Sequence, residues 1–289
     1  MKNNRIAYKR RYTARNIFQI MNGIFMLLVV IAVLIPIFKV FVDSLDKSTT
    51  YGINLWPKNP SFRAYEVIFS NKDLYRPFII SLITTAAGTF FGMFFITLGA
   101  YVLTQKEMFG RNFFALFIFI TMIFSGGLVP NYLLMRSLGL INTLWAVILP
   151  QSLNVYNMFL MKNFFEQIPN SLIESAEIDG ATPIETFVRI VLPLSSPALA
   201  SISLFFAVSY WNSFFDFVIY ITDTDLYNFQ VKLREMIISD QTMPDPSLAG
   251  YGNAVKNAVT IVAMIPPLIL YPFCQRYFVT GITLGAVKG

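Results

Sequence analysis

Five carboxylates are gathered within residues 163–193 of this sequence. The stretch contains Glu166, Glu174, Glu177, Asp179 and Glu185, with Arg189 as its only basic residue. Such a group can make charge-assisted contacts with a basic partner, or it can simply solvate the surface of a helix that connects two other elements.

Other kinds of chemistry lack their residues. The chain has no histidine and one cysteine, Cys274, which removes histidine acid–base catalysis, His/Cys metal sites and intrachain disulfides. No stretch resembles the Gly-x-x-x-x-Gly-Lys-[Ser/Thr] phosphate loop of ATPases. We therefore expect no catalytic, cofactor-binding or metal-binding residue, and a membrane-embedded enzyme is disfavoured because its apolar segments hold no acid pair.

A second set of polar and aromatic residues lies inside or beside apolar segments. These are Asn154, Tyr156, Asn157, Tyr210, Trp211, Asn212 and Asp216. Aromatic faces can stack on sugar rings while amides bond to hydroxyls, so these residues are candidates for contact with a hydrated solute. The alternative is that they form hydrogen bonds between membrane helices or anchor helix ends at the interface.

The elements that must position these residues are membrane helices. The chain is 55% hydrophobic and only 13% charged, which is too few charges to cover a water-soluble protein of 289 residues. Crossing a bilayer takes about 20 apolar residues. We predict an all-α membrane protein with six spans, each built around a charge-free run, at about 16–42, 78–104, 112–135, 137–161, 190–220 and 257–276.

The flanking segments predict the orientation. A basic tail, residues 1–15, carries six Lys and Arg residues and no acidic one, which favours a membrane flank in the cytoplasm over a nucleic-acid patch. Six spans then place both termini in the cytoplasm, including a C-terminal tail at 281–289, and make residues 16–280 a single membrane domain. The loop at 163–193, between the fourth and fifth spans, also faces the cytoplasm.

This loop contains two helix-start patterns. Ser171 with Glu174 and Thr182 with Glu185 each have the spacing of a capping box, and Pro183 stands at the first helical position of the second. Gly180 suits a left-handed stop between them. We predict two short helices, the first over about 172–179, with Ala176 and Gly180 as small residues that let another backbone come close.

The pattern of this loop resembles a known family. Glu174-Ser-Ala-x-x-x-Gly180, followed by Ile190-x-Leu192-Pro193, is similar to the EAA loop of permease subunits of binding-protein-dependent ABC importers, with Ser175 where alanine is usual. Softer similarity to carbohydrate-type permeases, as in the second membrane subunit of maltose importers, runs through 56–65, 126–145, 210–212 and 275–289.

The resemblance implies a role and partners. The loop would dock on a separate ATPase through Leu172, Ile173, Glu174, Ala176, Asp179 and Gly180. The ATPase, in two copies, would bind ATP and Mg. A second related permease and an external solute-binding protein would complete a carbohydrate importer in the bacterial cytoplasmic membrane, surrounded by lipid. Import of a non-sugar solute remains an alternative. A secondary transporter is less favoured, because the charge-free runs offer no coupled ionisable groups at mid-membrane.

Overall fold

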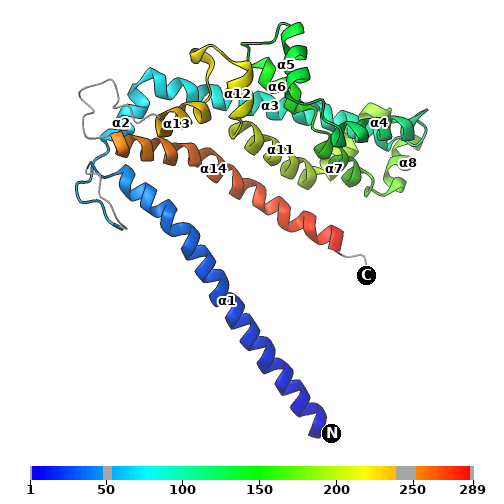
Figure 1. Ribbon diagram of the computed structural model, residues 1–289. Coiled ribbons are helices and arrows are strands. Elements are labelled where there is room, and N and C mark those ends of the chain that lie inside the picture. The colour runs from blue at the N-terminus through cyan, green and yellow to red at the C-terminus, as the bar shows by residue number, and fades with distance from the viewer. Residues whose placement is uncertain (1, 48–53, 239–251, 287–289) are drawn as a thin grey trace. The chain divides into compact units, whose positions relative to one another are not determined.

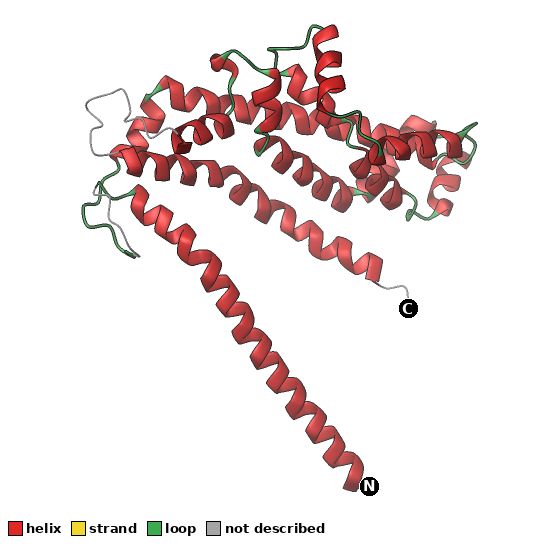
Figure 2. Ribbon diagram, in the orientation of Figure 1, coloured by secondary structure: helices red, strands yellow, loops and turns green. Residues whose placement is uncertain are grey.

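The computed structural model describes the backbone of residues 2–47, 54–238 and 252–286, and the side chains of residues 15–47, 54–238 and 252–272. Within these residues every regular element is a helix, apart from an isolated bridge between Asp46 and Pro60 (Figure 2). The chain divides into two units, one formed by Met1–Ile68 with Gln241–Ile261 and the other by Phe69–Asp240 with Val262–Gly289.

The first unit is built around a long apolar helix. It contains α1 (Lys2–Ser44) and the start of α2 (Arg63–Ser70). The hydroxyls of Ser44 and Tyr65 lie 2.7 Å apart, and the carboxylate of Asp46 accepts a hydrogen bond of 2.7 Å from the backbone N–H of Lys58. These contacts fold the segment after α1 back onto its end. From Arg15 onward α1 is long and apolar enough to span a membrane, and none of its most apolar window is buried.

The second unit is organised around α3 (Lys72–Thr104). The elements that follow are α4 (Arg111–Ile123), α5 (Leu128–Ser137), α6 (Trp145–Ser152), α7 (Val155–Phe165), α8 (Asn170–Ile178), α9 (Pro183–Thr186), the π-helical stretch Phe187–Val191, α10 (Leu192–Leu194), α11 (Ser196–Trp211), α12 (Phe215–Tyr220), the 3-10 turn Thr224–Leu226, α13 (Phe229–Ile238) and α14 (Gly252–Ala286), of which the part up to Ile261 belongs to the first unit. Helices α6, α7 and α11 pack along α3 (Figure 1).

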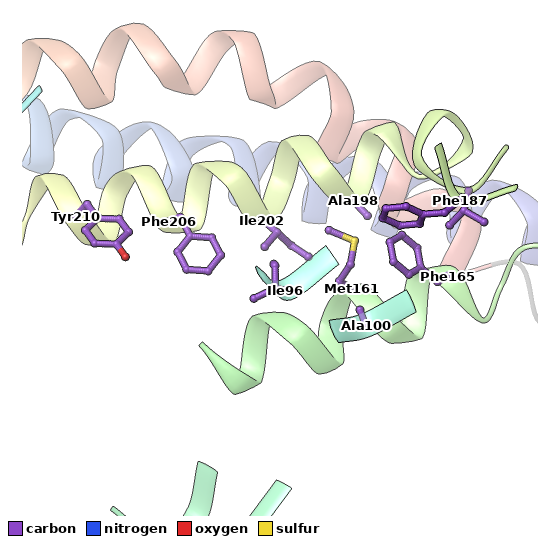
Figure 3. Packing of buried hydrophobic residues seen from close by; sticks show 10 residues of the cluster. Ile96, Ala100, Met161, Phe165, Phe187, Ala198, Ile202, Phe206 and Tyr210 are labelled. Carbon is purple, nitrogen blue, oxygen red and sulfur yellow. The ribbon is translucent and has the colours of Figure 1, made fainter. Parts of the chain in front are cut away.

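Close packing of α3 against α11 rests on two glycines. A Cβ atom at Gly88 would meet the ring of Tyr210, and one at Gly92 would lie 2.7 Å from Cε1 of Phe206. Small residues four positions apart therefore form a notch on α3 that receives the aromatic side chains of α11. The same buried cluster continues to Phe165 and Phe187 at its other end (Figure 3).

The six predicted spans fall largely on helical residues, but three of them are not continuous helices. The span predicted at 112–135 is α4 and α5, bent by 114°. The span at 137–161 contains the separate helices α6 and α7, and the span at 190–220 is interrupted between α10 and α11 and again before α12. By length and composition, the described residues contain three single helices that could cross a membrane, or five when each sharply bent pair counts as one.

Three of these interruptions have a local cause. Gly127 adopts a φ of 84°, and its N–H donates to the hydroxyl of Ser125, which forms a turn instead of a helix. Asn154 caps α7 with its side chain, so α6 must end before it. Pro197 lies at the start of α11, where proline is tolerated because the N–H it lacks has no helical partner.

Candidate functional site

The acidic loop begins with a helix that buries none of its side chains. Helix α8 starts one residue before the predicted capping box, with Pro169 at its N-cap and no side-chain cap. The predicted box of Ser171 and Glu174 is therefore wrong, because Ser171 already lies inside the first turn. There its carbonyl accepts a hydrogen bond of 2.7 Å from the hydroxyl of Ser175.

Gly180 ends this helix in the left-handed conformation that the sequence predicts, with a φ of 83°. The N–H of Ala181 donates to the carbonyl of Ala176 at 2.9 Å, and the N–H of Gly180 donates to the carbonyl of Glu177 at 3.0 Å. These two bonds form a Schellman motif. Gly180 consequently lies beyond the helix and not on a helical face with Ala176, which corrects the expected arrangement of the two small residues.

The second predicted capping box is confirmed. Glu185 accepts a hydrogen bond of 2.9 Å from the N–H of Thr182, while the N–H of Glu185 donates to the hydroxyl of Thr182 at 3.3 Å. The hydrogen bonds from the backbone and hydroxyl of Thr182, followed by the charge of Arg189, hold the pKa of Glu185 below its ordinary value. Pro183 occupies the first turn, so this short helix has a fixed beginning.

The predicted contact residues of α8 form an open surface. Glu174 and Asp179 are exposed, as is Leu172 at 44%, whereas Ile173 and Ala176 are half-buried. Ile178, at 86% exposure, adds a second large apolar side chain. Carboxylates beside apolar groups that the chain itself leaves uncovered suit a partner with a basic rim and an apolar cleft.

Among the polar candidates, Asp216 belongs to a hydrogen-bonded cluster that joins α6 to the start of α12 and to the segment before it. The Nε2 atom of Gln151 donates to Oδ2 of Asp216 at 2.6 Å and to the hydroxyl of Ser213 at 3.1 Å, and that hydroxyl lies 3.1 Å from the same Oδ2. The hydroxyl of Ser209 contacts Oε1 of Gln151 at 3.4 Å. The three uncharged members, Gln151, Ser209 and Ser213, were not predicted from the sequence. A glutamine inside an apolar run does indicate a hydrogen bond between membrane helices, so Gln151 could have been found.

The remaining polar candidates are distributed differently. Tyr156 and Asn212 are exposed, and the amide of Asn212 donates to the carbonyl of Val208 within α11 at 2.9 Å. Asn154 is exposed and accepts a hydrogen bond from the N–H of Asn157, which is itself buried. Asn154, Tyr156 and Asn212 can therefore meet a solute, while Asn157 is covered.

Tyr210 and Trp211 have interhelical partners instead. Both are buried, and the hydroxyl of Tyr210 donates to the carbonyl of Ile148 at 2.7 Å. The indole N–H of Trp211 donates to the carbonyl of Ala263 at 2.9 Å. Pro267, four residues later, has no N–H to offer that carbonyl, so Trp211 replaces the missing helical donor of α14. These contacts correspond to the alternative of hydrogen bonds between helices.

A cavity of about 430 Å³ lies beside Trp211, between α3, α11 and α14. Phe90, Val208 and Pro267 contribute to its lining, together with the hydroxyls of Thr85 and Thr89, which have no hydrogen-bond partner among the described residues. The surface is otherwise apolar. It therefore offers a hydrated solute far fewer partners than the cluster around Asp216.

Trp211→Phe is expected to destabilise the permease by about 1–3 kcal/mol, because the buried carbonyl of Ala263 then loses its donor while the aromatic packing is largely kept. The midpoint of thermal unfolding in detergent measures the effect. Trp145→Phe is the matched control, since Trp145 is 44% exposed. Equal midpoints for the two variants would contradict the role of the indole N–H.

Comparisons with known proteins agree with this arrangement. Residues 108–284 match the family described as binding-protein-dependent transport system inner membrane component. The polygalacturonan/rhamnogalacturonan transport system permease protein YtcP of Bacillus subtilis (strain 168) is 43% identical over 241 residues, which are 81% of this chain and 84% of that protein. The arabinooligosaccharides transport system permease protein AraQ of the same organism is 28% identical over 284 residues, 95% of this chain and 97% of that protein.

A solved structure matches nearly the whole fold. One chain in the crystal structure of a bacterial ABC transporter involved in the import of the acidic polysaccharide alginate is 30% identical, with a TM-score of 0.85 over 91% of this chain and 97% of that chain. A chain of the alginate transporter in complex with a pentasaccharide-bound periplasmic protein shares the fold at a TM-score of 0.57 and 14% identity. The protein therefore belongs to the family of binding-protein-dependent transport system inner membrane components, as a multi-pass permease subunit of an ABC importer.

Proposed function

We propose that this permease forms half of the translocation path for an oligosaccharide, and that the oligosaccharide is acidic. The relative at 43% identity is named for polygalacturonan and rhamnogalacturonan transport, and the structural match at 30% identity comes from an importer of the acidic polysaccharide alginate. A neutral oligosaccharide is the second candidate, because the arabinooligosaccharide permease AraQ is also a relative. It ranks second because AraQ is only 28% identical to this chain. A non-sugar solute has no support from these relatives.

One observation carries the coupling part of the proposal. Helix α8 buries no side chain, yet the segments before and after it are held by the rest of the chain. Before α8, the carboxylate of Glu166 binds Arg111 at 3.1 Å and Lys162 at 2.7 Å, and after α8 the chain continues through Gly180 into the capped helix α9. A helix that is held firmly but left uncovered suits a partner protein, here an ATPase that binds ATP and Mg.

The contacts follow from the exposed groups of α8. Glu174 would form a charge-assisted hydrogen bond with a basic side chain of the ATPase, and Asp179 would favour the same partner electrostatically. Leu172 and Ile178 would enter an apolar cleft, with Ile173 at its edge, while Ala176 and Gly180 leave room for close approach.

The proposed topology has six spans. The bent pairs α4–α5 and α10–α11 would each count as one span, and α6 with α7 would form the sixth beside α1, α3 and α14. Both termini and the acidic loop then lie in the cytoplasm, as the basic tail indicates. A second related permease would complete the path, and an external solute-binding protein would deliver the solute.

Inside the path, the uncharged groups of the cluster, Gln151 and Ser213, are the proposed contact with sugar hydroxyls, while Asp216 accepts hydrogen bonds from both. The hydroxyls and amides of the cluster can exchange partners with sugar hydroxyls without leaving a buried polar group unsatisfied. The exposed side chains of Asn154, Tyr156 and Asn212 extend the candidate surface.

Reconstitution of the whole importer in vesicles tests the proposal. We expect ATP-dependent uptake and solute-stimulated ATP hydrolysis with oligogalacturonides, and weaker responses with neutral arabino- and galacto-oligosaccharides of equal length. A stronger response to the neutral sugars would reverse the order of the two candidates. Uptake driven by an ion gradient without nucleotide would contradict the ATP-driven function itself.

A further inference from the structure

The second half of the acidic loop contacts the membrane bundle through a tyrosine of α3. Tyr101, near the end of α3, donates a hydrogen bond of 3.0 Å from its hydroxyl to the carbonyl of Pro183, the first residue of α9. The same ring lies 4.6 Å from the ring of Phe187, measured between centroids, at an interplanar angle of 32°. Tyr101 therefore holds α9 by a polar contact at its start and by ring packing at its end.

Phe187 is held from a second side as well. Its ring lies 6.3 Å from the ring of Phe165 at the end of α7, in an edge-to-face arrangement of 83°. The side chain is 7% exposed and belongs to the buried cluster that contains Val191 and Ala198 (Figure 3). Edge-to-face aromatic pairs fix ring orientation more firmly than aliphatic contacts do. One side chain thus joins the loop to α3, α7 and α11.

The backbone at this point is also unusual. Phe187 begins the π-helical stretch Phe187–Val191, which leads through α10 to a bend of 81° before α11. Such stretches are rare and often accompany function. Here the stretch presents Phe187 and Val191 to the interior, while Val188 between them is 52% exposed.

The two halves of the loop, before and after Gly180, consequently differ in how they pack. Helix α8 has no buried side chain, whereas the half that follows Gly180 has its aromatic residue locked among three helices. Close-packed interiors deform little, so a displacement applied at such a contact moves the attached helices instead of being absorbed locally.

On this basis, and resting on the proposed function, we propose that Tyr101 and Phe187 form the junction that passes ATPase motion from α8 to the membrane helices. Both are positioning residues, because neither is expected to touch the ATPase or the solute. The hydrogen bond to Pro183 sets the direction of α9, and the ring of Phe187 transmits its movement to α3 and α7.

The test uses the whole importer with Phe187→Leu, Tyr101→Phe and the control Phe229→Leu. Phe229 is fully buried and pairs edge-to-face with Phe78, so its replacement removes comparable packing outside the loop. We expect the number of ATP molecules hydrolysed per solute imported to rise about fivefold or more in Phe187→Leu, and less in Tyr101→Phe, since coupling energies of this size are usual. The control should lower thermal stability with an unchanged ratio.

A second readout does not depend on the solute. In a Cys274→Ser background, a cysteine introduced by Val208→Cys on α11 should change its rate of labelling when ATP is added, and Phe187→Leu should abolish that change while the ATPase still co-purifies. The proposed junction would be contradicted if ATP still changed the labelling rate in Phe187→Leu. It would also be contradicted if Phe187→Leu hydrolysed no more ATP per solute imported than the control does. Failure of the wild-type importer to move any carbohydrate would contradict the proposed function, whereas the labelling result would still decide the junction.

Discussion

Gly180→Val is expected to reduce ATP-dependent uptake by about five- to thirtyfold while leaving the permease folded and inserted. The φ of 83° places this residue in the left-handed region, where an L side chain costs about 1–2 kcal/mol, and each 1.4 kcal/mol is about a factor of ten in an equilibrium. No atom lies within 4 Å of a Cβ built at this position, so the effect arises from the backbone. Relief of the strain would turn α8 away from the ATPase. Uptake and membrane content of the variant are measured together.

The chain provides a closely matched control for this variant. Gly139 ends α5 in an equivalent turn, with a φ of 68°, open space around its Cβ position, and backbone bonds from Gly139 to Arg136 and from Leu140 to Met135. Gly139→Val should therefore impose similar strain outside the acidic loop. If it impairs uptake as strongly as Gly180→Val does, then a general loss of stability explains both results and α8 has no special role.

Gly88→Ala is expected to destabilise the permease by about 3 kcal/mol or more, at the upper end of the cost of overpacking a core. The added Cβ would lie 2.6 Å from Cε1 of Tyr210 and closer still to the neighbouring ring atoms. The ring cannot move aside, because it is fully buried and its hydroxyl is bound to the carbonyl of Ile148. We expect a lower unfolding midpoint in detergent and a lower yield of folded protein.

Two further variants test whether the effect comes from the contact between the added Cβ of residue 88 and the ring of Tyr210, or whether α3 tolerates no alanine in place of glycine. Gly99→Ala brings its Cβ 2.7 Å from Sδ of Met158, a flexible side chain that can rotate away, so stability should hardly change. Combining Gly88→Ala with Tyr210→Leu should cost less than the sum of the two single changes, because the clash is then relieved. Additive costs would show that the ring of Tyr210 is not the obstacle.

The sequence predicted the features that depend on neighbouring residues. The capping box of Thr182 and Glu185 and the left-handed Gly180 are confirmed, because their hydrogen bonds close within a few positions. The box at Ser171 failed for an equally local reason. With Pro169 at its N-cap, the helix starts two residues earlier than the pattern suggested, which leaves the serine hydroxyl too far along the first turn to act as the cap.

Features that join distant segments could not be predicted in this way. Apolar composition identified the membrane segments but carried no information about their straightness, and the turn at Gly127 divides a run that hydropathy treats as continuous. The pairing of Tyr101 with Pro183 spans 82 positions. Similarly, the indole of Trp211 donates to the carbonyl of Ala263, which lacks its helical donor because Pro267 has no N–H. No local pattern determines where the helix that carries these two residues lies.

Because α8 takes no part in the core, mutation can alter its outer side chains at little cost to the stability of the membrane bundle. Under the proposed coupling role of α8, recognition of the ATPase and stability of the membrane bundle can therefore evolve separately. After gene duplication, a duplicated permease could come to bind an ATPase of its own, or share one with related transporters, through substitutions confined to the exposed side chains of α8.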